Sequence, residues 1–278
     1  MLSGVLSDSK RVVAAHSRHF LALTVLFILP LSLLLLFTPS FFSPPRSLLR
    51  SSYHSDPLPY LLAGVLCLFL LAAVSSISAS THHGFFGRPV HLLPTLISIP
   101  SPILRLILTL FLPTLLLIAL LFLAPSPLIY APILLLSTLY FIVCSLIPII
   151  VVLESTWGFP PFHRSFHLLT GMRCAALILN LSFSFLLGII LWVFNSSVGF
   201  NYEIRSQGVR DIVRTVLGSA VSTVMLLYLI VTNTVLYMYC KALHGELEAE
   251  IVREFAWDYV SLPFDDHKVP HIVSVSHP

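Results

Sequence analysis

Two histidines one helical turn apart form the clearest chemical pattern in the chain. His163 and His167 have an H-x3-H spacing, which places both rings on one face of a helix, a geometry that can chelate a metal ion. The only second cluster is His82-His83, which lacks the H-x-x-H-H spacing of multi-histidine metal boxes. The pattern therefore favours histidines that lie beside lipid head groups over a metal site.

Other nucleophiles and titratable groups show no catalytic arrangement. The sequence has no Ser-His-Asp order, G-x-S-x-G elbow, phosphate-binding loop or H-E-x-x-H helix. Its four cysteines lie in or at the edge of apolar runs without a C-x-x-C spacing, which indicates small packing residues rather than disulfides. Cys174 and Cys240, near helix ends, are the positions open to palmitoylation. We expect no catalytic residue, no bound metal and no cofactor.

Glu154 is the one acidic residue at a predicted membrane boundary. It begins a polar segment between two long apolar runs, and the same segment contains Arg164 and Arg173. Either arginine can pair with the Glu154 carboxylate and hold the segment in place. We therefore expect the stretch from Val151 to Arg173 to lie on, or dip into, a membrane between two spanning helices.

Uncharged polar and small residues interrupt the apolar runs. None of these runs has an Asp, Glu, Lys or Arg at mid-span, where ion-coupled carriers place the charged residues of their pathway. Hydrogen bonding between helices is the default role of such polar groups, and small residues spaced by four predict close helix packing. The polar set is Asn180, Asn233, Ser182, Ser184, Thr223, Thr232 and Thr234. The small set is Ala72, Ser76, Ser80, Gly218 and Ser222.

The elements that must position these groups follow from hydropathy. Apolar residues make up 57% of the 278 positions and charged residues only 10%, against about 25% charged residues in a soluble domain. The mean hydropathy is +0.95, and several runs exceed the roughly 18 residues that mark a spanning helix. The predicted fold class is an all-α, multi-pass membrane bundle. Six spans are expected, at about residues 20–41, 58–78, 102–123, 127–153, 174–194 and 216–240.

The two ends of the chain differ from this spanning domain, residues 20–240. Residues 1–19 combine apolar positions at helical spacing with basic side chains, which predicts an interfacial amphipathic helix on the cytosolic side. A signal peptide is the rival interpretation, but the following run is too long and lacks an A-x-A-like site. Pro30 is expected to kink the first span.

The tail, residues 241–278, is acidic. It holds three basic and seven acidic side chains, a net charge of −4 against +7 in the remainder, which argues against nucleic-acid binding. Its pattern predicts a helix to about residue 260, which can extend the sixth span, and a loose end beyond. Ten Lys and Arg residues on the side of both termini, against five on the other, place both termini in the cytosol.

Two stretches resemble a family of uncharacterised plant multi-pass membrane proteins. One is an E-x3-G-x6-S-x2-L-x2-G segment after the fourth span, at Glu154, Gly158, Ser165, Leu168 and Gly171. The other is the tail, in which Cys240, Lys241 and His244 match a Cys-Lys-x-x-His pattern and residues 259–262 a Tyr-Val-Pro-Leu ending. Ser261 replaces that proline, and Pro160-Pro161 stands where the family tends to have alanine.

The resemblance implies a helical protein of an endomembrane, such as the endoplasmic reticulum, or of the plasma membrane, with no assigned reaction. It supplies no catalytic residues. The residues expected to have structural roles are Glu154, Gly158, Arg164, Ser165, Gly171 and Arg173. Three hypotheses follow: a non-catalytic membrane organiser or adaptor that binds lipid or a soluble partner through its tail, a channel or transporter for a neutral or lipid-like solute, and a histidine-dependent membrane metalloenzyme. The oligomeric state stays open.

Overall fold

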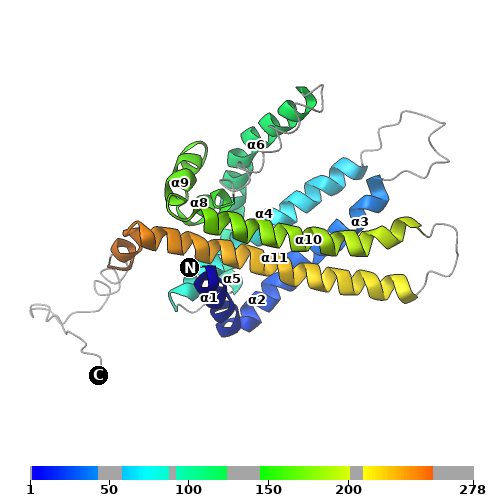
Figure 1. Cartoon of the computed structure of the whole chain (residues 1–278), viewed down its shortest axis with the longest axis horizontal. Coiled ribbons are helices and arrows are strands. Elements are labelled where there is room, and N and C mark those ends of the chain that lie inside the picture. The colour runs from blue at the N-terminus through cyan, green and yellow to red at the C-terminus, as the bar shows by residue number, and fades with distance from the viewer. Residues whose placement is uncertain (1, 43–57, 88–91, 124–144, 201–208, 253–278) are drawn as a thin grey trace, which may run out of the picture. The chain divides into compact units, whose positions relative to one another are not determined.

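Helices form every regular element of the part of the chain that the computed structural model describes, residues 2–42, 58–87, 92–123, 145–200 and 209–252. Two compact units divide the chain, Met1–Cys240 and Lys241–Pro278. The helices, labelled in Figure 1, are α1 Leu2–Ala15, α2 Ser17–Leu23, a π-helical turn η1 Thr24–Ile28, α3 Leu29–Phe42, α4 Leu58–Phe85, α5 Leu92–Ser98, α6 Pro100–Leu123, α8 Ile147–Leu153, α9 Pro160–Leu168, α10 Arg173–Phe200 and α11 Val209–Leu243. The predicted all-α class is confirmed.

Four of these helical stretches are long and apolar enough to cross a membrane. They are Ser17–Leu36, Leu61–Phe85, Arg173–Phe194 and Val213–Leu243. They coincide with the first, second, fifth and sixth predicted spans. The third predicted span falls within α6, and most of the fourth falls in residues 124–144, outside the described residues, with α8 as its last turns. The total of six spans therefore stays a prediction.

A π-helical turn interrupts the first span just before Pro30. The Leu29 amide donates to the Thr24 carbonyl, five residues back, instead of the usual four. Proline has no amide hydrogen, and its ring collides with the carbonyl four residues earlier in a regular α-helix. Widening the preceding turn accommodates both effects, so the disturbance expected at Pro30 takes the form of a π turn.

Helix α1 packs on protein. Its buried residues are Val5, Ser9 and Val12, and the helix contacts α2 and α4. The Tyr239 hydroxyl of α11 donates to Asp8 Oδ2 at 2.6 Å. The amphipathic pattern predicted for residues 1–19 thus ends earlier, at Ala15, and its buried stripe faces the helical bundle instead of a lipid surface alone.

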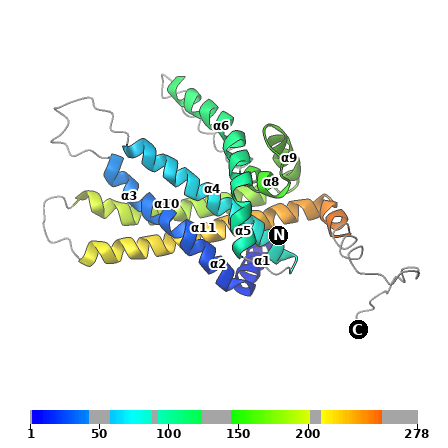
Figure 2. The same ribbon diagram turned by 180° about the vertical axis from the view of Figure 1, so that it is seen from behind.

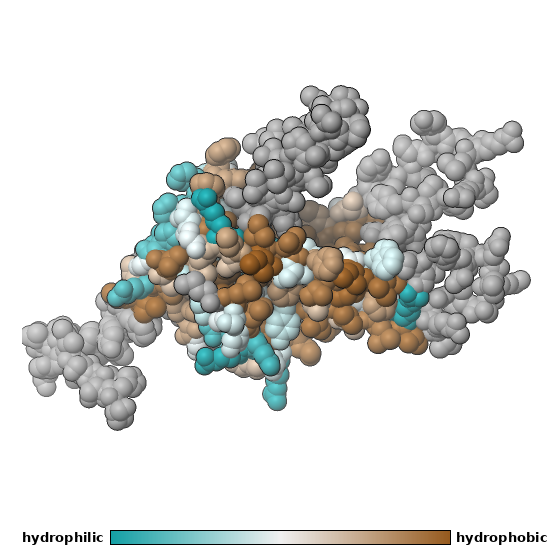
Figure 3. Space-filling model, in the orientation of Figure 1, coloured by the Kyte–Doolittle hydropathy of each residue, from teal (hydrophilic) through white to brown (hydrophobic). Residues whose placement is uncertain are grey.

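Helices α10 and α11 lie side by side in both views of the ribbon (Figures 1 and 2). Apolar side chains gather over them on the surface in Figure 3, which fits helices that face lipid. They approach closely at Gly218, where a Cβ atom would lie 2.8 Å from Cγ of Phe194. All five small residues that the spacing singled out are buried, as close packing predicts.

We expect Gly218→Ala to lower the free energy of unfolding by about 1 kcal/mol, because the added methyl group displaces the Phe194 ring. A fall of a few degrees in the apparent Tm of the detergent-solubilised protein would report it. Gly188→Ala in α10 is the matched control, since its Cβ would meet nothing within 4 Å and alanine is the better helix former. Equal effects of the two substitutions would contradict close packing at Gly218.

The core nearest to the polar segment joins α4, α6 and α8. Leu71, Leu106, Ile147 and Val151 form a buried cluster, and Phe162 of α9 packs against it. Because α8 is held from two sides by apolar contacts, its last residue has a defined position. That residue precedes Glu154.

A break in the helix follows Leu243, within the tail unit. Gly245 has a φ of +72°, a left-handed conformation that ends helices, and its amide donates to the Ala242 carbonyl at 3.1 Å. Residues 246–252 are helical again. The sixth span is therefore extended only to Leu243, and the helix at residues 246–252 is a separate element, contrary to one expectation from the spacing. Lys241 Nζ donates to Glu250 Oε2 at 2.8 Å within this unit.

Candidate functional site

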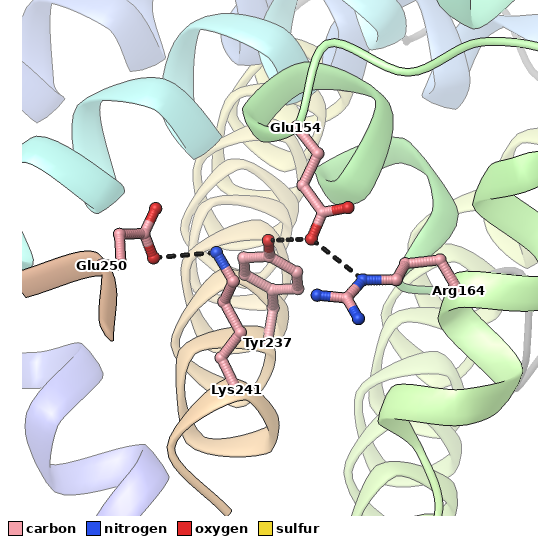
Figure 4. Close-up of polar contacts among 5 residues, drawn as sticks. All are labelled: Glu154, Arg164, Tyr237, Lys241 and Glu250. Atoms are coloured by element: carbon pink, nitrogen blue, oxygen red, sulfur yellow. Dashed lines mark hydrogen bonds and ion pairs between the residues drawn. The ribbon is translucent and has the colours of Figure 1, made fainter. Parts of the chain in front are cut away.

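The Glu154 carboxylate joins three elements of the main unit. Glu154 caps the carboxyl end of α8, where its amide donates to the Ile150 carbonyl at 2.8 Å. Its Oε1 accepts a hydrogen bond from Arg164 Nε at 3.2 Å and another from the Tyr237 hydroxyl at 2.8 Å (Figure 4). Of the two basic partners predicted for Glu154, the structure shows Arg164.

The cluster of Glu154, Arg164 and Tyr237 is largely buried, so it can hold the helices that it connects in place. The side chain of Glu154 is 20% exposed and that of Arg164 is 30% exposed, and Tyr237 is fully buried in α11. A carboxylate that accepts two hydrogen bonds, one of them from a guanidinium, is held more firmly than a neutral acceptor would be. The end of α8, helix α9 and helix α11 are therefore tied through one oxygen atom.

The backbone after Glu154 turns through two left-handed residues. Ser155 has a φ of +55° and Gly158 a φ of +83°. Arg105 Nη1 donates to the Ser155 carbonyl at 3.3 Å, and the Gly158 amide donates to Thr109 Oγ1 at 3.1 Å. Helix α6 thus holds the turn at two points. Gly158 has open space around its Cβ position, so its conformation is what requires glycine.

Helix α9 begins at the two prolines of the segment. Pro160 and Pro161 lie in its first turn, where a missing amide hydrogen costs nothing, so they initiate the helix instead of breaking it. Pro161, Ser165 and Leu168 form its buried face. Gly171, with a φ of +95°, then turns the chain into α10 at Arg173. The left-handed conformations of Gly158 and Gly171 thus set the path of the segment on either side of α9.

The opposite face of the segment is aromatic and basic. Trp157, Phe159 and Phe166 are 64%, 75% and 53% exposed. The Arg173 guanidinium lies over the Phe166 ring at 4.6 Å from the ring centroid, within the range of a cation–π contact. His163 and His167 are also exposed, one turn apart on α9 as their spacing predicts.

The histidine clusters form no metal site among the described residues, where no three or more His, Cys, Asp or Glu side chains gather with a geometry for a metal ion. His82 and His83 lie in the last turn of α4, with ring centroids 5.8 Å apart. The pair at His163 and His167 therefore gains no further ligand in the described part of the chain. Two imidazoles alone leave the coordination of a zinc ion half filled.

The two cysteines open to palmitoylation by their position have different environments. Cys174 is exposed at the start of α10. Cys240 is buried in α11, with its Sγ 3.8 Å from Sδ of Met172. Burial withholds Cys240 from a modifying enzyme, so Cys174 is the accessible position of the two.

Two pairs of polar residues within the spans bond across helices. Asn180 of α10 and Asn233 of α11 exchange two hydrogen bonds of 3.1 Å between their side-chain amides. The second amide hydrogens go to the Ala176 and Leu229 carbonyls of their own helices, at 2.9 and 3.0 Å. Ser32 of α3 and Thr223 of α11 lie 2.7 Å apart, oxygen to oxygen. These groups join helices, as their residue types predict.

Three residues of the site escape prediction from the sequence: Tyr237, Arg105 and Thr109. A tyrosine near the end of a long apolar run is a signal for a buried hydroxyl that needs a partner, but its partner is 83 residues away. In the sequence, Arg105 looks like any other basic residue near a membrane boundary, and Thr109 like any polar residue within an apolar run. Nothing in their spacing points to the backbone of the turn after Glu154.

Comparison with known proteins gives a family and no further relatives. No curated protein and no solved structure matches the chain. A family model described as a domain of unknown function, DUF8558, matches residues 60–261, which include all but the start of α4, and α6, the Glu154 cluster, α10 and α11. The chain therefore belongs to the DUF8558 family.

Proposed function

We propose that the protein is a multi-pass membrane protein that organises a partner or lipids and catalyses no reaction. Six spans, with both termini in the cytosol, remain the topology that the sequence favours. The proposed location is an endomembrane, such as the endoplasmic reticulum, or the plasma membrane. In this proposal the spans form a rigid support, and the surfaces at their cytosolic ends contact other molecules.

The mutual pairing of Asn180 and Asn233 carries this proposal. Both side chains are buried, and each amide spends both of its hydrogens and its oxygen on protein atoms. A transport path needs polar groups that can exchange a protein partner for a solute. Since these two mid-span asparagines already bond to each other and to their own helices, a supporting role fits them better than a solute path.

The tail offers the surface for a soluble partner. It forms a compact unit of its own, and its described helix carries Glu246, Glu248 and Glu250 within five residues. Glu250 is paired with Lys241, whereas Glu248 is exposed. An acidic helix of this kind suits a basic partner surface, because complementary charge raises the rate and specificity of association.

Removal of the tail tests the proposal. The full chain and a chain ending at Cys240 would be isolated in mild detergent from the same cells at equal amounts, followed by native mass spectrometry and quantification of co-purifying proteins. We expect the full chain to carry a component in stoichiometric amount above its own 30.9 kDa, and the shortened chain to lose it.

Two controls sharpen this comparison. A chain ending at Leu262 keeps the acidic stretch and should retain the component, whereas a charge-neutralised tail, Glu246→Gln with Glu248→Gln, should weaken its binding. An identical set of components on the full chain and on the chain ending at Cys240 would refute docking through the tail. An extra mass equal to one or two metal ions would instead support the metalloenzyme hypothesis.

A further inference from the structure

The apolar stretch Arg173–Phe194 of α10 has the length and the end residues of a helix that spans a bilayer. From Arg173 to Trp192 it rises about 28 Å at about 1.5 Å per residue, close to the roughly 30 Å of a hydrocarbon core. Trp192 is exposed near the far end of this stretch, where Arg214 donates to the Val193 carbonyl and lies 6.0 Å from the Phe194 ring centroid. Aromatic and basic side chains at both ends mark two membrane interfaces.

The segment before α10 then lies at the level of the lipid head groups. Its buried face, with Pro161 and Leu168, packs on the protein, so its exposed aromatic rings point away from the bundle. Aromatic side chains at this depth favour the boundary between head groups and acyl chains. The lipid leaflet at the Arg173 end of α10 is therefore the surface that these rings meet.

The charge of this face is positive. The sequence contains no Asp or Glu from Ser155 to Arg173, and the carboxylate next to it, Glu154, already binds Arg164. Arg173, on the Phe166 ring, and Arg105, at the Ser155 carbonyl, add two guanidinium groups. Each basic residue held near an anionic leaflet strengthens the attraction about fivefold.

We propose that this face, the α9 platform (Trp157, Phe159, Phe166, Arg105 and Arg173), selects anionic phospholipids at the membrane interface. The inference rests on the membrane placement proposed above. The aromatic rings enter the leaflet, and the two arginines hold the phosphate or carboxylate groups of the lipids beside them. The platform thereby gathers anionic lipid around one end of α10.

Tryptophan fluorescence in lipid nanodiscs tests this selection in the full chain. The double variant Trp192→Phe with Trp257→Phe keeps Trp157 as its single tryptophan. The double variant Trp157→Phe with Trp257→Phe keeps Trp192, the matched reporter near the other end of the stretch Arg173–Phe194 of α10. Each protein is placed in phosphatidylcholine nanodiscs with the same small fraction of brominated phosphatidylserine or brominated phosphatidylcholine. Bromine quenches tryptophan on contact, so the ratio of the two quenching values measures local enrichment.

We expect brominated phosphatidylserine to be enriched at least about fivefold around Trp157, with no preference around Trp192. Arg105→Gln with Arg173→Gln should abolish the preference at Trp157, and Arg173→Lys should keep it. Arg11→Gln is the charge control, because Arg11 is 82% exposed on α1, outside the α9 platform. It should change nothing.

Each other outcome contradicts a stated part of the inference. Equal quenching of Trp157 by the two lipids, or a preference that survives the double arginine substitution, would overturn the selection of anionic lipid. The same preference at Trp192 would show that the platform is not its cause. If neither tryptophan is quenched by either lipid, the membrane placement itself fails, and the proposed function fails with it.

Discussion

Glu154→Leu is expected to lower the free energy of unfolding by about 3 kcal/mol. The change removes the acceptor of the fully buried Tyr237 hydroxyl and the charge partner of Arg164. A buried donor without a partner costs about 1–3 kcal/mol, and Arg164, which is partly exposed, loses less because water replaces the carboxylate. The apparent Tm in detergent should fall by roughly 6–12 °C.

Two further substitutions separate the contributions to this loss. Glu154→Gln keeps an oxygen for Tyr237 and removes only the charge, so it should cost about 1 kcal/mol. Tyr237→Phe in the Glu154→Leu background should recover part of the stability, because the buried hydroxyl is then gone. Unchanged thermal stability of both Glu154 variants would rule out a structural ion pair, and purely additive effects with Tyr237→Phe would rule out the shared oxygen.

Asn233→Leu is expected to cost about 1–2 kcal/mol, since it leaves the buried Asn180 amide without two of its three hydrogen bonds. The double variant Asn180→Leu with Asn233→Leu should recover most of the loss, because paired apolar side chains leave no orphaned group. Apparent Tm values of the single and double variants form a double-mutant cycle that measures the coupling.

Ser182→Ala provides the control for this cycle. The Ser182 hydroxyl donates to the Leu179 carbonyl of its own helix, so its loss should change the free energy of unfolding by only a few tenths of a kcal/mol. A single Asn233→Leu that is as stable as the unsubstituted protein would mean that the asparagines do not depend on each other. A double variant less stable than either single variant would exclude the predicted recovery.

Much of the helical framework could be predicted because hydropathy acts locally. The stretches at Leu61–Phe85, Arg173–Phe194 and Val213–Leu243 match predicted spans within a few residues at most of their ends, since a long apolar run has one stable form where water is absent. The polar segment after α8 and the pairing of Glu154 with Arg164 could also be predicted from the sequence, because both residues lie in one short stretch.

Contacts between distant parts of the chain could not be predicted. Tyr237 and Asn233 differ from their apolar neighbours by a polar group. The sequence around them does not indicate that their hydrogen-bond partners are Glu154 and Asn180. The spacing does not predict the break at Gly245, because the apolar positions continue across it, whereas the left-handed φ of one glycine ends the helix. Hydrogen bonds between distant residues depend on which helices are neighbours in the fold, and residue spacing does not determine which helices these are.

The contact between α1 and α11 has a consequence for biosynthesis. Asp8 and its partner Tyr239 are 231 residues apart, so one is made near the start of translation and the other near its end. At about 5–20 residues per second, roughly 10–50 s separate the two. During that interval the side of α1 that carries Gly4 and Asp8 lacks the Tyr239 side chain that later lies against it. A ribosome-bound chain therefore holds its N-terminal helix incompletely packed until the last span arrives, and chains that stall before α11 would present that helix to the cell's quality control.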